Sequence, residues 1–140
     1  MPVQEEESLS DAFWAVARQL RHRTKVALEP WDLSPSQGRA LTVLARHGDL
    51  RLSSVAEHLR IAPRSATEVV DDLQQRGLVE RRPDPDDRRA VLVTLTSHGT
   101  AVTTEIQAAR QAASARLFAV LDPADRQDLL RVLGKLRDDT

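Results

Sequence analysis

Apolar residues recur at steps of three and four in a long stretch near each end of the chain, which is the spacing of one face of an α-helix. The first stretch spans about residues 8–28, where Ser8 suits the N-cap position. The second spans about residues 97–121 and is followed by Asp122 and Pro123, a pair typical of a new helix start. The pattern therefore predicts one long helix near the N-terminus and two helices near the C-terminus.

Three shorter helices are predicted in the middle of the chain. Residues 34–37 place a capping Ser, a Pro at the first helical position and a Gln at the third, and Gly48 is expected to end this helix. Two further helices are predicted over about residues 53–59 and from Pro63 to Gly77. Because only about three residues join these two helices, we expect them to form a helix-turn-helix unit.

The hydrophobic period changes to two over residues 78–82 and 89–95, which predicts two β-strands. The loop between them, residues 83–88, is charged and rich in turn-forming residues, so we expect a hairpin with a projecting tip. The predicted fold class is therefore mainly α with a small β-hairpin, and residues 34–97 form the expected helix-turn-helix module.

The terminal helices carry more apolar surface than a module of this size can cover. Packing against a second copy of the same helices would bury that surface in a two-fold homodimer. We therefore predict that residues 8–33 and 98–138 form a helical dimerisation region. The alternative is a monomer in which these helices fold back over the module.

The composition removes several classes of protein from consideration. The chain has 140 residues, 20 Lys and Arg against 21 Asp and Glu, and no Cys. The absence of Cys excludes disulfides, zinc–thiolate sites and cysteine redox switches. Aromatic residues make up only 3%, which argues against a single-strand nucleic-acid binder that needs stacking platforms. The near-neutral charge does not by itself indicate a DNA-binding protein.

The sequence also shows no sign of catalysis, membrane insertion or export. It contains no nucleophile–base pair, no metal-ligand spacing among its His residues and no Gly-rich phosphate loop, so we expect no enzyme activity, metal or cofactor. Residues 1–7 lack the features of a signal peptide, and no apolar run approaches the ~20 residues that span a bilayer. We therefore expect a cytoplasmic protein with no membrane partner.

The segment from Gly77 to Gly99 resembles the wing signature of the MarR family of winged helix-turn-helix regulators. That signature has an Asp and an Arg two residues apart, then apolar strand positions, then Leu-Thr and a Gly. Here it falls on Asp87, Arg89, Val93, Leu95, Thr96 and Gly99. Residues 55–59 resemble the first helix of the family's helix-turn-helix, and residues 65–67 and 70–73 resemble its recognition helix.

The resemblance implies a winged helix-turn-helix module flanked by N- and C-terminal dimerisation helices. It implies a homodimer that binds double-stranded DNA at a pseudo-palindromic operator and regulates transcription, most often as a repressor. A small aromatic or lipophilic effector commonly relieves repression in this family. The alternative function is a winged-helix dimer that serves as a protein-interaction module without sequence-specific DNA binding.

The start of the recognition helix is expected to meet base edges in the major groove. The predicted contact residues there are Pro63, Arg64, Ser65, Ala66 and Thr67. Arg64 can contact guanine with two hydrogen bonds, and the methyl groups of Ala66 and Thr67 can touch a thymine methyl. Ser36, Ser53 and Ser54 lie at helix starts and are predicted to contact phosphates.

The hairpin supplies the second set of predicted DNA contacts. The resemblance implies that Arg89 enters the minor groove and that Asp87 pairs with its guanidinium group. Arg81, Arg82 and Arg88 are expected to contact phosphates or to support the hairpin.

Two acids depart from the family pattern on the recognition helix. Glu68 and Asp72 stand where family members often carry Arg, so they would face phosphates unfavourably or accept a hydrogen bond from a cytosine amino group. Both support the alternative of a protein-interaction module. Ala62 also replaces the Ser often found as the N-cap of this helix.

An effector site is predicted along and just after the first helix. Its candidate residues are Trp14, Arg18, His22 and Trp31. A Trp beside a cation would suit an aromatic carboxylate, whereas the alternative role of each Trp is packing in the core or at an interface.

Overall fold

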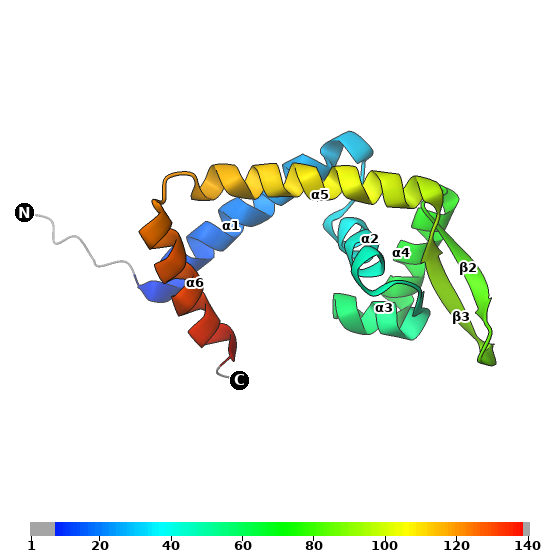
Figure 1. Cartoon of the computed structure of the whole chain (residues 1–140). Coiled ribbons are helices and arrows are strands. Elements are labelled where there is room, and N and C mark those ends of the chain that lie inside the picture. The colour runs from blue at the N-terminus through cyan, green and yellow to red at the C-terminus, as the bar shows by residue number, and fades with distance from the viewer. Residues whose placement is uncertain (1–7, 139–140) are drawn as a thin grey trace, which may run out of the picture.

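The structure is a computed structural model that describes residues 8–138. Residues 1–7, which we expect to carry no signal peptide, and residues 139–140 lie outside the described range. The elements in chain order are α1 (Leu9–Leu28), the 3-10 turn η1 (Glu29–Trp31), α2 (Pro35–His47), β1 (Leu50–Arg51), α3 (Leu52–Leu59), α4 (Pro63–Gln75), β2 (Val79–Asp84), β3 (Asp87–Leu95), α5 (Ser97–Phe118) and α6 (Pro123–Asp138). The long helix α5 runs from the winged module at one end to α1 and α6 at the other (Figure 1).

Local capping chemistry explains where most of the helices begin. The Ser8 hydroxyl accepts a hydrogen bond from the Asp11 backbone N–H at 3.1 Å, which starts α1. Ser34 and Gln37 form the full reciprocal capping box at the start of α2. Asp122 likewise accepts from the Asp125 N–H at 2.8 Å before α6. These predicted helix starts are confirmed, whereas α5 ends at Phe118, earlier than the predicted residue 121.

The sheet has three antiparallel strands in the order β1-β3-β2, where the sequence predicts only a hairpin. The additional strand, β1, pairs Leu50 with Val93 and Arg51 with Leu92. A strand of two residues has too few positions to show a period of two, so the sequence pattern could not reveal it. The hairpin strands also run closer to the tip than predicted, to Asp84 on β2 and from Asp87 on β3.

A single core joins the module to the first half of α5. Its largest fully buried side chains come from α1, α2, α3, α4, the sheet and α5, and they are Leu28, Leu41, Leu59, Leu73, Ile106, Val55, Val70, Val79 and Val93. The start of α5 lies directly on the chain before β2, because a Cβ at Gly99 would stand only 1.9 Å from the Leu78 carbonyl oxygen. The position of α5 relative to the module is therefore set by backbone contact.

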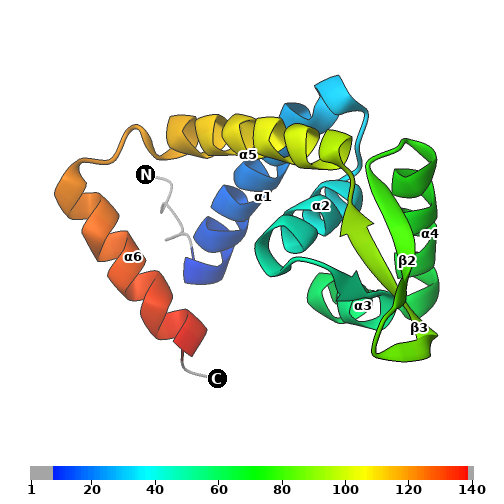
Figure 2. The ribbon, with the colours of Figure 1, turned by 45° about the vertical axis from the view of Figure 1, so that its right-hand side comes forward.

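The other end of the molecule leaves its apolar residues uncovered. Helix α1 packs along α5, but α6 has no buried residue and stands apart from the module in both views (Figures 1 and 2). The large exposed apolar side chains of α1 and α6 include Leu9, Phe13, Trp14, Val16, Val26, Leu129, Leu130, Val132, Leu133 and Leu136. Helix α6 therefore does not fold back over the module. No helix between residues 8 and 138 is both long and apolar enough to cross a membrane.

Candidate nucleic-acid interface

Helix α4 divides its residues between the core and solvent. Val70 and Leu73 are fully buried, and so is Ala66, at 0% exposure. The expectation that the Ala66 methyl group meets a thymine is therefore wrong, because helical periodicity turns it into the core. Pro63, Arg64 and Ser65 are exposed at the helix start. The half-buried Thr67 donates its hydroxyl hydrogen to the Pro63 carbonyl at 3.0 Å.

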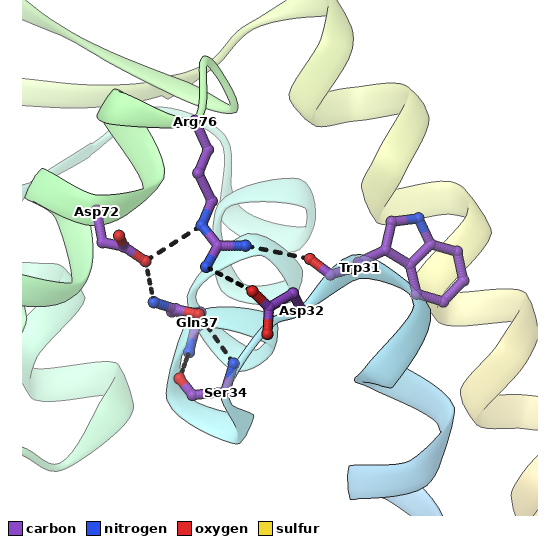
Figure 3. Close-up of polar contacts among 6 residues, drawn as sticks. All are labelled: Trp31, Asp32, Ser34, Gln37, Asp72 and Arg76. Atoms are coloured by element: carbon purple, nitrogen blue, oxygen red, sulfur yellow. Dashed lines mark hydrogen bonds and ion pairs between the residues drawn. The ribbon is translucent and has the colours of Figure 1, made fainter.

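Asp72 differs from Glu68 because its half-buried side chain has partners within the chain. Its carboxylate accepts a hydrogen bond from the Gln37 side-chain amide on α2 and pairs with Arg76 Nε at 3.3 Å (Figure 3). Gln37 and Arg76 therefore hold the Asp72 carboxylate toward α2. Glu68 is exposed, and no side chain in residues 8–138 pairs with it.

Arg76 extends this contact to the corner between α1 and α2. It donates from Nη1 to the Trp31 carbonyl at 3.1 Å, and its Nη2 lies 3.9 Å from the Asp32 carboxylate (Figure 3). The Trp31 indole N–H in turn donates to Glu105 on α5 at 3.2 Å. The end of the recognition helix is thus linked through Trp31 to α5. The sequence did not predict this link, because Arg76 and Trp31 are 45 positions apart.

The tip of the wing is held by the buried carboxylate of Asp84, which is 7% exposed. It accepts from the Asp86 backbone N–H at 2.9 Å and from Arg51 Nε on β1 at 2.8 Å. The Asp86 hydrogen bond is the largest cause of the lowered pKa of Asp84, and Arg51 adds to it against the opposing effect of burial. Arg51 and Asp84 therefore fix the turn against the edge strand, a role the sequence pattern did not indicate.

The arginines of the wing fall into two groups. Arg81 pairs with Asp71 on α4 at 2.6 Å and also contacts Gln74, so it supports the hairpin. Arg82 pairs with Glu80 at 2.5 Å. By contrast, the guanidinium groups of Arg88 and Arg89 are exposed and have no partner within the described range.

Asp87 acts on the backbone of Arg89 and not on its side chain. Its carboxylate accepts from the Arg89 backbone N–H at 3.0 Å. No ion pair joins it to the Arg89 guanidinium among the residues described, so the implied pairing is absent from the free chain. The hydrogen bond shapes the turn and leaves the Arg89 side chain unrestrained.

The three predicted phosphate-contact serines lie at the second or third position of their helices. Ser36 follows Pro35 in α2, and Ser53 and Ser54 follow Leu52 in α3. Backbone N–H groups in a first helical turn lack intrahelical partners and favour anions. The structure thus places these serines at two helix N-termini of the module.

Two cavities border Trp31. A cavity of about 660 Å³ lies between α1 and α5, and its lining includes His22, Arg23, Trp31 and Arg116. A second one of about 490 Å³ lies beside Arg76, Trp31 and His98. Two of the predicted effector residues, His22 and Trp31, therefore line a cavity.

The other two predicted effector residues do not lie at these cavities. Trp14 is 53% exposed and packs edge-on against Phe13, with ring centroids 6.2 Å apart. Trp14 and Arg18 are absent from the linings of both cavities and lie closer to the exposed start of α1.

Helices α2, α3 and α4 with the three-stranded sheet and its projecting hairpin define the winged helix-turn-helix class of DNA-binding proteins. The MarR family model matches residues 33–91. The HTH-type transcriptional repressor MdtR of Bacillus subtilis is 30% identical over 110 residues, which cover 79% of this chain and 71% of that protein. The chain belongs to the MarR family.

Solved structures agree over the whole fold. A MarR variant from E. coli complexed with operator DNA is 25% identical with a TM-score of 0.79, covering 91% of this chain and 92% of that one. BpsR of Bordetella bronchiseptica, whose DNA binding is regulated by 6-hydroxynicotinic acid, is 26% identical with a TM-score of 0.79 and covers 99% of each chain. The protein is thus a DNA-binding regulator of transcription, and not an enzyme.

Proposed function

We propose that this chain forms a homodimer that binds a pseudo-palindromic operator and represses transcription until a small effector binds. One observation carries the DNA-binding mode: Arg64, Arg88 and Arg89 project from the recognition helix and the wing without partners in residues 8–138. The neighbouring cations Arg76 and Arg81 are both paired. The free arginines are therefore available to DNA without first breaking an ion pair.

In this proposal, Arg64 contacts guanine from the major groove, with Pro63, Ser65 and Thr67 beside it. Arg89 enters the minor groove, where a narrow groove concentrates negative potential. Arg88 contacts phosphate. Hydroxyl and backbone N–H groups at two helix N-termini contact the flanking phosphates, and they belong to Ser36, Ser53 and Ser54.

Binding of the purified chain to DNA flanking its own gene tests this mode. We expect Arg64→Ala and Arg89→Ala each to weaken binding by roughly tenfold or more, since a specific arginine contact contributes about 1–3 kcal/mol. Arg82→Ala is the matched control, because Arg82 is already paired with Glu80. Affinity should also fall steeply with salt concentration. Equal losses in all three variants would contradict the assignment.

The uncovered apolar side chains on α1 and α6 support the homodimer. Residues 8–33 and 98–138 form the proposed dimerisation region, and residues 34–97 form the DNA-binding module. Two modules related by a two-fold axis would meet two half-sites of a pseudo-palindrome. Analytical ultracentrifugation tests this assembly directly, and a monomer at micromolar concentration would contradict it.

The cavity between α1 and α5 supports a response to a small aromatic carboxylate. Arg23, His22 and Arg116 offer positive charge or hydrogen bonds, and Trp31 offers an aromatic wall. The Trp31 backbone carbonyl accepts a hydrogen bond from Arg76 at the C-terminal end of α4, so a ligand that shifts the backbone at Trp31 would disturb α4. We expect 6-hydroxynicotinic acid, used as a probe, to change tryptophan fluorescence and weaken DNA binding, and Arg116→Ala to reduce both effects.

The alternative of a protein-interaction module has lost part of its support. It rested on two acids facing DNA, and Asp72 instead pairs with Gln37 and Arg76. An intact dimer that binds no fragment of its own flanking DNA would favour this alternative.

A reporter gene tests the direction of regulation. Reporter expression that does not rise when the regulator is deleted would contradict repression.

A further inference from the structure

Arg64 and Glu68 occupy the same outward face of the recognition helix. They are one turn apart, because an α-helix has about 3.6 residues per turn. The buried residues Ala66 and Val70 define the opposite face. When α4 lies in a major groove, Glu68 therefore points toward the bases along with Arg64.

Glu68 is the one acid of α4 that the fold leaves free. Asp71 is paired with Arg81 at 2.6 Å, and Asp72 is held by Arg76 at 3.3 Å. Glu68 is exposed and has no hydrogen bond or ion pair from its side chain within residues 8–138. Two of the three carboxylates are thus neutralised by arginines, while the third meets the DNA with its full charge.

An ionised carboxylate only accepts hydrogen bonds, and this restricts the base that it can contact. In the major groove guanine presents two acceptors, thymine presents an acceptor and a methyl group, and adenine presents its amino group beside the N7 acceptor. Cytosine presents an amino donor with no acceptor of its own beside it. Cytosine is therefore the base whose edge suits Glu68 best.

We propose that Glu68 determines operator specificity by accepting a hydrogen bond from a cytosine amino group, one helical turn from the guanine contact of Arg64. This inference rests on the proposed function, since it requires α4 to lie in the major groove. The Glu68 carboxylate also repels the phosphates of any DNA sequence. Only a sequence with the cytosine offsets this repulsion with a hydrogen bond, so affinity for the other sequences is lower. It selects a sequence by disfavouring the others.

Selection from a pool of randomised DNA duplexes tests this role, because the selection itself reveals the operator sequence. The wild-type dimer should enrich a motif with a C·G pair at one position in each half-site. Glu68→Ala should lose the preference at that position only, where wild type discriminates by about 5-fold to 150-fold. Glu68→Gln should move the preference toward A·T, because an amide can bond both the amino group and N7 of adenine.

Glu57→Gln is the matched control, because Glu57 is an exposed acid on α3 whose side chain has no partner in the described chain. We expect this variant to keep the wild-type motif. The proposal is overturned if both Glu68 variants select the wild-type motif, even when they bind all sequences more tightly. If wild type itself enriches no motif, the proposed operator binding fails together with it. Unchanged thermal midpoints establish that the variants are folded.

Discussion

The winged module contains amphipathic helices, and the terminal helix α6 is amphipathic as well. Only the module buries its apolar residues within one chain. The short helix α3 buries Val55, Ala56 and Leu59. Helix α6 is twice as long, with 16 residues against 8, and buries none. Similar sequence patterns therefore give buried apolar residues in α3 and exposed ones in α6, because α3 is surrounded by α2, α4 and the sheet. Helix α6 has no such neighbours within residues 8–138, so its apolar residues stay exposed, and the proposed dimer would cover them.

The largest effect should follow from opening the core of the module. Leu41→Ala removes a side chain that is 0% exposed, so we expect a loss of about 2–5 kcal/mol in the free energy of unfolding. Urea denaturation followed by circular dichroism measures this loss. The matched control is Leu130→Ala on α6, assayed at concentrations too low for a dimer, since Leu130 is 71% exposed. Equal losses in both variants would contradict the conclusion that the module buries its apolar residues within one chain and α6 does not.

The second effect tests what covers α6. Leu130→Glu places a charge on a surface that the proposed dimer buries, where a leucine contributes about 1.5–3 kcal/mol. We expect the dissociation constant of the dimer to rise by roughly tenfold or more while the module stays folded. Sedimentation equilibrium measures the dissociation constant of the dimer, and the cooperativity of urea unfolding followed by far-ultraviolet circular dichroism shows whether the module is folded. Lys135→Glu, a charge change on the same helix, serves as the control for charge alone. A dimer unaffected by Leu130→Glu would place the interface elsewhere.

The elements that the sequence predicted best are those determined by neighbouring residues. The caps at Ser8, Ser34 and Asp122 depend on contacts three residues away, so their chemistry is visible in the chain. The strand β1 and the Arg76–Trp31 contact depend on residues that are distant in sequence, and no local pattern encodes them. The same limit applies to the cavity between α1 and α5, which forms only when these two helices meet.

Ala66 shows a different kind of failure, because the sequence did contain the necessary signal. Its spacing of four and seven residues from Val70 and Leu73 places all three on one helix face. The methyl group of Ala66 lies near the start of the helix, but the helical period places it in the core and away from the bases. Asp72 combines both cases: its pair with Arg76 is four residues away and visible in the sequence, whereas its contact with Gln37 crosses between two helices.

The third effect compares a glycine in α5, where that helix packs on the module, with a glycine in α6. A Cβ at Gly99 in α5 would meet the Leu78 carbonyl oxygen at 1.9 Å, so Gly99→Ala should lower the free energy of unfolding by about 1–3 kcal/mol. At Gly134 in α6, no atom of residues 8–138 beyond the local helix backbone lies within 4 Å of the added atom. Gly134→Ala should therefore stabilise by about 0.4–1 kcal/mol through helix propensity. Thermal unfolding measures both, and a loss of the same size at the two sites would contradict the packing described for α5.

The smallest effect is confined to the tip of the wing and depends on pH. The folded pKa of Asp84 lies below its ordinary value of 3.8, so its contribution to stability is present above that value. It is lost as the pH falls below 3.8 and through the lower folded pKa, because protonation breaks the bond to Arg51 and weakens the one from the Asp86 N–H. We expect the protection of the Asp84, Asp86 and Asp87 amides against hydrogen exchange, after division by the intrinsic exchange rate at each pH, to fall over that range. In Asp84→Asn this protection should already be lower at neutral pH and lose this pH dependence. Since the two proteins differ only at residue 84, the difference between the two profiles isolates Asp84, and identical profiles would show that the carboxylate does not hold the turn.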